Sequence, residues 1–164
     1  MAEKVIVASA QTDPSLMKTK QNLEIILTLT GEAANRRAKL VVFPECALTG
    51  YIFTSREEAL PYAETIPGPS TEEVTALCKS LDIHSIYGLL EKDGDKLFNA
   101  AVLVGPQGVI GSYRKNHLPF LGIDRFVDPG DRPFNVHKTS IGNIGMQICY
   151  DIIFPESSRI QSLS

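Results

Sequence analysis

The apolar positions of this chain alternate between short strand-length runs and longer stretches with helical spacing. Residues 4–11 and 40–43 are apolar, β-branched runs, whereas the apolar residues between 18 and 38 recur every three or four positions. Pro44 ends the second run, because proline cannot donate a hydrogen bond to a strand ladder. The order strand, helix, strand predicts a crossover unit of two parallel strands, with Glu45 at the carboxyl end of the second.

The middle of the chain predicts a second helix. The segment Ser70-Thr-Glu-Glu73 fits a helix-capping box. The apolar residues that follow it at helical spacing are Val74, Leu77, Cys78 and Leu81. Cys78 is therefore expected in the core, with no catalytic part.

The second half of the chain predicts mostly strands. We expect them at 84–91, 97–104, 109–113, 134–139 and 141–148, with turns at 93–95 and 106–108. The last strand leads into Cys149, and Pro155 followed by Glu156 indicates the start of a helix. Residues 48–69 and 116–133 form two long loops, which in compact domains tend to be functional or mobile.

Composition narrows the class of protein. At 164 residues and 43% apolar composition, the chain predicts one globular domain over 1–164. A net charge of −3 with no basic stripe argues against a nucleic-acid partner, and the longest apolar runs are far too short to span a membrane. We see no secretory signal and no C-x-x-C pair among the three cysteines, so we expect a cytoplasmic protein without a disulfide framework or zinc site.

Three reactive residue types follow predicted strands in the order glutamate, lysine, cysteine. Glu45, Lys115 and Cys149 each stand at such a strand end. A thiol between a strand and a helix start lies beside backbone N–H groups that can stabilise a thiolate and later an oxyanion. Taken singly, each residue more often has an ordinary role: a solvated loop acid, a surface lysine and a packed thiol.

Three motifs around these residues carry a family resemblance. They are Val41-Val-Phe-Pro-Glu45, Tyr113-Arg-Lys115-Asn-His-Leu and the stretch from Cys149 through Phe154-Pro-Glu-Ser-Ser-Arg159. With these motifs in this order, the chain resembles the nitrilase, or carbon–nitrogen hydrolase, superfamily over essentially its whole length. The resemblance implies an α/β protein with an α-β-β-α sandwich. It also implies that 1–164 is an incomplete carbon–nitrogen hydrolase domain whose C-terminal part is missing.

The resemblance also implies a mechanism. Glu45 would act as general base, Lys115 would stabilise charge, and Cys149 would form a thioester; this scheme needs no metal and no cofactor. The base is expected in a poorly solvated site, where its pKa rises enough to exchange protons near neutral pH. The family's second acid would lie between Lys115 and Cys149, where Asp124 is the nearest candidate, although aspartate reaches less far than glutamate. Tyr51 and Tyr150 join Asp124 as candidate substrate-binding residues.

Several hypotheses for function stay open at this point. The first is a thiol hydrolase that cleaves a small amide or N-carbamoyl compound and releases ammonia, with nitrile cleavage as a variant. The second is a non-catalytic fragment that acts as a binding or assembly module, and the third is an ammonia-donating amidotransferase part. We expect a homo-oligomer, assign His117 a supporting role near the site, and assign Cys46 to packing or pocket lining.

Overall fold

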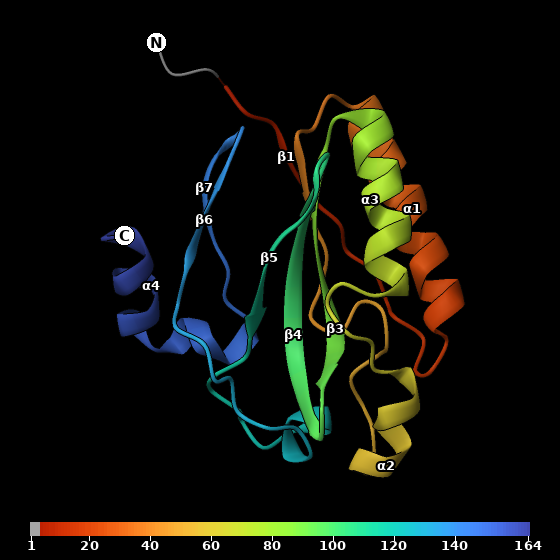
Figure 1. Cartoon of the computed structure of the whole chain (residues 1–164), viewed down its shortest axis with the longest axis vertical. Coiled ribbons are helices and arrows are strands. Elements are labelled where there is room, and N and C mark those ends of the chain that lie inside the picture. Colours follow the sequence, from red (N-terminus) through yellow and green to blue (C-terminus); the bar gives the residue numbers. More distant parts are fainter. Residues whose placement is uncertain (1–3) are drawn as a thin grey trace.

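The computed structural model describes residues 4–164 and shows two β-sheets enclosed by helices (Figure 1). The strands are β1 (Val7–Ser9), β2 (Leu40–Val42), β3 (His84–Asp93), β4 (Lys96–Gly105), β5 (Gly108–Arg114), β6 (Val136–Thr139) and β7 (Gly142–Gly145). The α-helices are α1 (Thr19–Asn35), α2 (Arg56–Ala59), α3 (Pro69–Leu81) and α4 (Pro155–Ser162). Short 3₁₀ helices are η1 (Leu60–Tyr62), η2 (Gly122–Arg125) and η3 (Cys149–Ile153).

The larger sheet has the order β1-β2-β3-β4-β5. Its β1, β2 and β3 run parallel, as the predicted crossover requires, and β3, β4 and β5 continue as antiparallel hairpins. The hairpin of β6 and β7 forms a separate antiparallel sheet. The carboxyl ends of β2 and β5 therefore deliver Glu45 and Lys115 to one end of the larger sheet.

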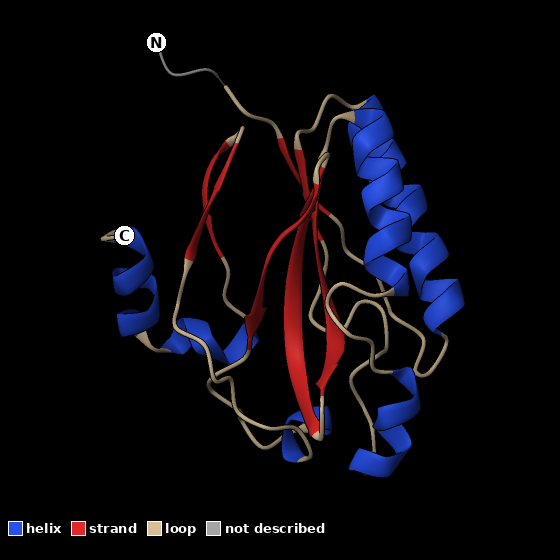
Figure 2. Ribbon diagram, viewed as in Figure 1, coloured by secondary structure: helices blue, strands red, loops and turns tan. Residues whose placement is uncertain are grey.

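The layers follow the order helix, sheet, sheet, helix. In Figures 1 and 2, α1 and α3 cover one face of the larger sheet, the β6–β7 hairpin lies on the other face, and α4 lies outside the hairpin. This is the α-β-β-α sandwich that the resemblance predicts. Within residues 4–164, no helix combines the length and the apolar character needed to cross a membrane.

Two apolar cores hold these layers together. Between the helices and the larger sheet, Ile26, Val74 and Leu89 are at most 1% exposed. Between the two sheets, Leu103 and Met146 belong to a second cluster of buried side chains. Burying a side chain of this size contributes roughly 1.5–3 kcal/mol relative to leaving it exposed, so the two cores fix the spacing of the layers. Cys78 lies in the first core, as expected.

The predicted cap of α3 is wrong. The helix begins at Pro69 with Gly68 as its N-cap, two residues before the expected Ser70. Proline suits the first helical position, because its missing N–H would have no partner there. The Thr71 side chain, three residues after the N-cap, caps the helix instead. Its Oγ1 accepts from the Gly68 N–H at 2.8 Å and donates to the Gly68 carbonyl at 2.7 Å.

Each of the strand segments predicted above is present among residues 4–164 and in the predicted order, but several ends differ from the prediction. The first strand is limited to Val7–Ser9, because it pairs with β2 over three residues. The strand expected to reach Cys149 ends at Gly145, which pairs with Val136 at the start of β6. Met146 and the two residues after it therefore continue beyond the ladder, and Cys149 opens a 3₁₀ turn.

Candidate active site

The Glu45 side chain is presented by a tight turn after β2. Cys46 has a φ of +50°, in the left-handed region that favours glycine. The turn packs against the backbone of β3, where the Gly88 N–H donates to the Pro44 carbonyl at 3.3 Å. A β-carbon on Gly88 would lie 2.3 Å from the Cys46 nitrogen. Glycine at position 88 thus permits the close approach that fixes Glu45.

Lys115 is the first residue after β5 and is buried between two carboxylates. Its Nζ lies 2.6 Å from Glu45 Oε1 and 2.6 Å from Asp124 Oδ2. Burial is the largest single effect on the pKa of Lys115 and lowers it, but the hydrogen bonds and negative charges of Asp124 and Glu45 together outweigh burial and raise the pKa. Lys115 is therefore a fixed cation inside the site.

Asp124 lies in η2, and the fold compensates for its short side chain. The Ile123 N–H donates to the Tyr51 carbonyl at 2.9 Å, which draws the η2 backbone toward the site. The buried Asp124 carboxylate then accepts hydrogen bonds from Lys115 and, at 2.8 Å, from the Tyr51 hydroxyl. Burial and this hydrogen bond raise the pKa of Tyr51, so its hydroxyl stays a donor.

Asn99 is a member of the site that the sequence analysis missed. From the middle of β4, its Nδ2 donates to Glu45 Oε1 at 2.7 Å and to Asp124 Oδ1 at 2.8 Å. Its Oδ1 accepts from the Cys46 thiol at 3.6 Å. One buried amide therefore holds both carboxylates around Lys115. The available signal was an amide inside the apolar run of 97–104, because a buried amide requires hydrogen-bond partners.

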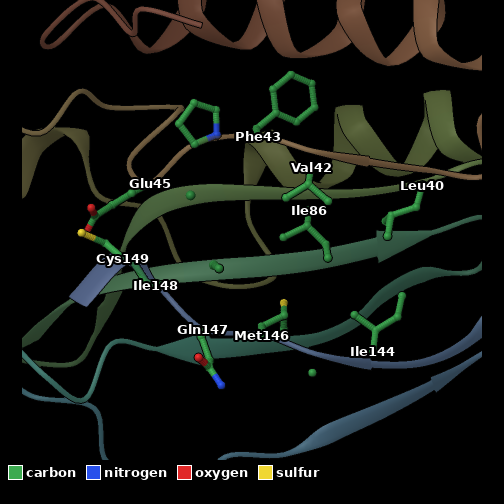
Figure 3. Close-up of a pocket in the computed structure, with 14 residues that line it drawn as sticks. Leu40, Val42, Phe43, Glu45, Ile86, Ile144, Met146, Gln147, Ile148 and Cys149 are labelled. Carbon is green, nitrogen blue, oxygen red and sulfur yellow. The ribbon is translucent and has the colours of Figure 1, made fainter. Parts of the chain in front are cut away.

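Cys149 brings its thiol to the Glu45 carboxylate, as Figure 3 shows. The residue is exposed and has a φ of +48°. Partial burial and then the negative charge of Glu45 raise the pKa of Cys149, while Lys115 acts in the opposite direction. The expected thiolate-stabilising field is thus not the dominant effect. The resting group is therefore a thiol beside the Glu45 carboxylate.

A cavity of about 400 Å³ opens between the two sheets, with Glu45 and Cys149 at one end (Figure 3). Its walls are largely apolar and come from β2, β3, β4 and the segment around β7. The side chains from the larger sheet include Leu40, Val42 and Ile86, and those from the opposite wall include Ile144, Met146 and Ile148.

The remaining candidates occupy other positions. Tyr150 follows the nucleophile, and its ring packs edge-on against Phe154, with centroids 5.4 Å apart; its proposed part in binding substrate stays a prediction. Cys46 is fully buried, and burial followed by the charge of Glu45 raises the pKa of its thiol. His117 contacts Asp151 through Nδ1 at 2.7 Å.

Comparison with known proteins establishes the family. The family model described as carbon-nitrogen hydrolase matches residues 6–164, and the chain therefore belongs to the carbon–nitrogen hydrolase family.

Individual relatives agree with this assignment. The chain is 41% identical over 160 residues to a nitrilase of Pyrococcus abyssi, covering 97% of the chain and 61% of that protein. It is 35% identical to human omega-amidase NIT2, covering 79% of the chain and 49% of the relative. The chain thus spans between 49% and 61% of the length of these two curated relatives.

Solved structures show the same fold. A carbon-nitrogen hydrolase from Helicobacter pylori G27 superposes with a TM-score of 0.83 at 26% identity, covering 97% of this chain and 56% of that one. Nit3 of Saccharomyces cerevisiae is described as a member of branch 10 of the nitrilase superfamily. It superposes with a TM-score of 0.81 at 27% identity, covering 94% of this chain and 59% of that one. In both pairs the shared fold covers nearly all of this chain.

Proposed function

We propose that this chain carries the catalytic centre of a thiol hydrolase that cleaves a non-peptide carbon–nitrogen bond. The substrate would be a small carboxamide or N-carbamoyl compound, and the product would be released with ammonia. The observation that carries this proposal is the meeting of Cys149, Glu45 and Lys115 in one partly enclosed site. Membership of the carbon–nitrogen hydrolase family supports the reaction class.

The geometry suggests how the first half-reaction proceeds. Glu45 accepts the thiol proton as Cys149 Sγ bonds to the amide carbon, and the carbonyl oxygen becomes an oxyanion. Two carboxylates use two of the three N–H donors of the Lys115 ammonium, leaving one for that oxyanion. Glu45 then returns the proton to the leaving nitrogen, and collapse of the tetrahedral intermediate breaks the carbon–nitrogen bond. Ammonia departs, and the acyl group stays on Cys149 as a thioester.

The second half-reaction reuses the same acid and base. Water gives a proton to Glu45 and attacks the thioester carbon, and collapse of the intermediate breaks the carbon–sulfur bond. The acid product leaves, and the proton on Glu45 returns to the sulfur. Asn99 and Asp124 would keep Glu45 and Lys115 in place through both steps.

The decisive experiment measures ammonia release from a panel of small amides, including compounds with a terminal carboxamide, because several relatives are named omega-amidases. Activity should disappear in Cys149→Ala. Lys115→Ala should cost about as much, because groups that act as a unit are not additive. Added hydroxylamine should trap the acyl group as a hydroxamate, which reports the thioester.

The alternative is a non-catalytic binding or assembly module. Amide binding by calorimetry without ammonia release, unchanged in Cys149→Ala, would support that alternative and exclude the hydrolase.

A further inference from the structure

The buried carboxylate of Asp151 lies two residues after the nucleophile and outside the Glu45–Lys115 network. Its side chain is fully buried. Oδ1 accepts from the backbone N–H of His117 at 3.1 Å and lies 2.7 Å from His117 Nδ1. Oδ2 accepts from the Tyr113 hydroxyl at 2.8 Å and from the Ile148 N–H at 3.1 Å. We call Asp151, His117 and Tyr113 the Asp151 cluster.

The Asp151 cluster joins the two segments that carry the proposed catalytic residues. Tyr113 and His117 stand two residues before and two residues after Lys115, whereas Ile148 directly precedes Cys149. Three hydrogen bonds from Tyr113 and His117 therefore tie the Lys115 segment to the Asp151 carboxylate, and a fourth, from the Ile148 N–H, anchors that carboxylate to the nucleophile turn. Without this tie, the two segments could separate at the site.

The same carboxylate closes a ring around the backbone of the nucleophile. The Asp151 N–H donates to the Ile148 carbonyl at 3.0 Å, and Asp151 Oδ2 accepts from the Ile148 N–H. Cys149 lies inside this ring with a φ of +48°, which a residue with a β-carbon adopts at an energetic cost. The two hydrogen bonds between Asp151 and Ile148 hold the backbone of the turn in this conformation and keep Cys149 Sγ directed at Glu45.

His117 is held by two separate contacts. Because a carboxylate only accepts, His117 Nδ1 carries a proton and donates it to Asp151. The imidazole also stacks on Phe154, with ring centroids 3.9 Å apart. These two contacts can be removed independently by mutation.

We propose that Asp151 is a positioning residue for Cys149, and that His117 orients the Asp151 carboxylate through its Nδ1 hydrogen. The effect of this positioning on catalysis rests on the proposed hydrolase function. The positioning itself is a property of the folded site. Neither residue touches the reacting atoms, so neither is a catalytic residue.

The test is the pH dependence of alkylation of Cys149 by iodoacetamide, resolved by mass mapping of the folded protein. Asp151→Asn keeps the size of the side chain, but its amide has only one accepting oxygen. It therefore cannot accept all four hydrogen bonds that the Asp151 carboxylate accepts. His117→Asn keeps a donor near the position of Nδ1, whereas His117→Phe keeps the stacking on Phe154 and loses the donor. Val74→Ala, in α3 on the other side of the larger sheet, is the matched control for lost stability without a lost hydrogen bond.

Asp151→Asn and His117→Phe should both move the alkylation midpoint to lower pH, by about one pH unit. In these variants the Cys149 thiol is expected to move away from the partly buried position beside Glu45. Because burial and Glu45 raise its pKa in that position, the pKa should fall when the thiol moves away. His117→Asn and Val74→Ala should keep the wild-type midpoint. A wild-type midpoint in folded Asp151→Asn and His117→Phe would overturn the proposal and leave the cluster a structural role.

The two variants of His117 decide the matter if Asp151→Asn does not fold. A shift in His117→Phe with none in His117→Asn supports positioning, and equal behaviour of the pair refutes it. Alkylation needs no turnover, so this outcome is independent of the proposed function. A wild-type protein that releases no ammonia, yet shows the expected shifts, would refute the hydrolase and keep the positioning role.

Discussion

Lys115 Nζ lies 2.6 Å from Asp124 Oδ2, and neither side chain is exposed to solvent. A carboxylate one methylene shorter than glutamate reaches the lysine because η2 brings its backbone toward Tyr51. A buried ion pair is balanced between the cost of desolvation and mutual attraction, so removing one partner leaves an uncompensated charge. Asp124 should therefore control the charge of Lys115.

The first prediction concerns Asp124→Asn and the alkaline stability of the fold. The pKa of Lys115 is raised in the folded state, so its positive charge stabilises the fold. This stabilisation is complete below the pKa of the unfolded chain, about 10.4, and is lost as pH rises through the folded pKa. Asp124→Asn removes one attraction, lowers the folded pKa, and should flatten this loss. Urea unfolding followed by circular dichroism, at several pH values between about 9 and about 11, measures how the free energy of unfolding falls with pH.

Tyr51 needs its own control in this experiment. Burial and Asp124 raise the pKa of its hydroxyl too, so it contributes to the same alkaline loss. Tyr51→Phe in both backgrounds removes that contribution. Tyr87 and Tyr113 also have raised pKa values, but Asp124 is not among the causes, so they contribute equally to both backgrounds. The difference in slope then reports the effect of Asp124 on Lys115 and, more weakly, on Cys46 and Cys149. Identical slopes with and without Asp124, once Tyr51 is Phe, would contradict the prediction.

The second prediction concerns the thiol and two charges of opposite sign. Cys149 should be alkylated faster than the buried Cys46 and Cys78. Glu45→Gln should lower the midpoint of Cys149 alkylation, because the negative charge of Glu45 raises its pKa. Lys115→Met should raise that midpoint, because the lysine acts in the opposite direction.

Opposite shifts separate a shared electrostatic site from mere exposure. An exposed but isolated cysteine would give the same midpoint in both variants. Shifts in one direction only, measured by mass mapping of alkylation against pH, would show that one of the two charges does not act on the sulfur.

Sequence reasoning predicted most of the elements, because these depend on local patterns. The parallel unit from β1 to β2 followed from apolar spacing, and Glu45 and Lys115 followed from their places at strand ends. The end of the last strand was placed too late. Gly145 has its partner at the start of β6, and this pairing depends on register between strands, which one run of apolar residues does not specify.

The contacts of Asn99 and Asp151 were beyond prediction for a related reason. Each is a single polar residue in an apolar neighbourhood, and its partners come from distant parts of the chain. Sequence shows that such a group needs hydrogen bonds but not where they are. Asp124, by contrast, is a candidate from the sequence, because the family resemblance implies a second acid between Lys115 and Cys149.

The third prediction tests the close approach at Gly88. Gly88→Ala would place a β-carbon 2.3 Å from the Cys46 nitrogen and 2.7 Å from the Pro44 carbonyl. The Glu45 turn must move away, and a misplacement of about 1 Å can cost about 100-fold in rate. Ammonia release under saturating substrate would measure this loss.

Gly31→Ala is the matched control for Gly88→Ala. Gly31 lies within α1, and a β-carbon there meets nothing within 4 Å. That change should leave activity intact and stabilise the fold by up to about 1 kcal/mol, because alanine favours the helix. Full activity of Gly88→Ala would show that the turn tolerates displacement.

The fourth prediction concerns a buried cation beside the site. The Arg114 side chain is 2% exposed and pairs with Glu91, Asp93 and Asp131. Its guanidinium also lies 3.9 Å from the centroid of the Phe98 ring. Arg114→Met should destabilise the fold by about 3–5 kcal/mol, because the buried Glu91 loses its two hydrogen bonds to Arg114 and keeps the looser ion pair with Arg132 at 3.7 Å.

Lys39→Met gives the comparison for an exposed pair. Lys39 and Asp82 lie 2.6 Å apart, but their side chains are 46% and 78% exposed. Such a pair contributes about 0–1 kcal/mol, so this variant should unfold almost as the wild type does. Equal free energies of unfolding for Arg114→Met and Lys39→Met, from urea titration, would contradict the assigned difference.

The fifth prediction is self-association, which the sequence analysis expected. Phe120 and Leu121 in the loop after Lys115, and Ile152 and Ile153 after Cys149, are each more than 60% exposed. Exposed apolar side chains favour association with other chains. Sedimentation velocity over a range of concentrations should show a species larger than one chain. Ile152→Lys combined with Ile153→Lys should shift it toward the monomer.

The matched control for that shift is Leu60→Lys. Leu60 is 39% exposed and lies in η1, away from both apolar segments in the sequence. It adds one positive charge without changing the residues after Cys149, and should leave the distribution of species unchanged. Two distinct results would contradict the prediction. One is a wild-type monomer at every concentration, and the other is equal dissociation by Leu60→Lys, which would show that charge rather than lost apolar surface separates the chains.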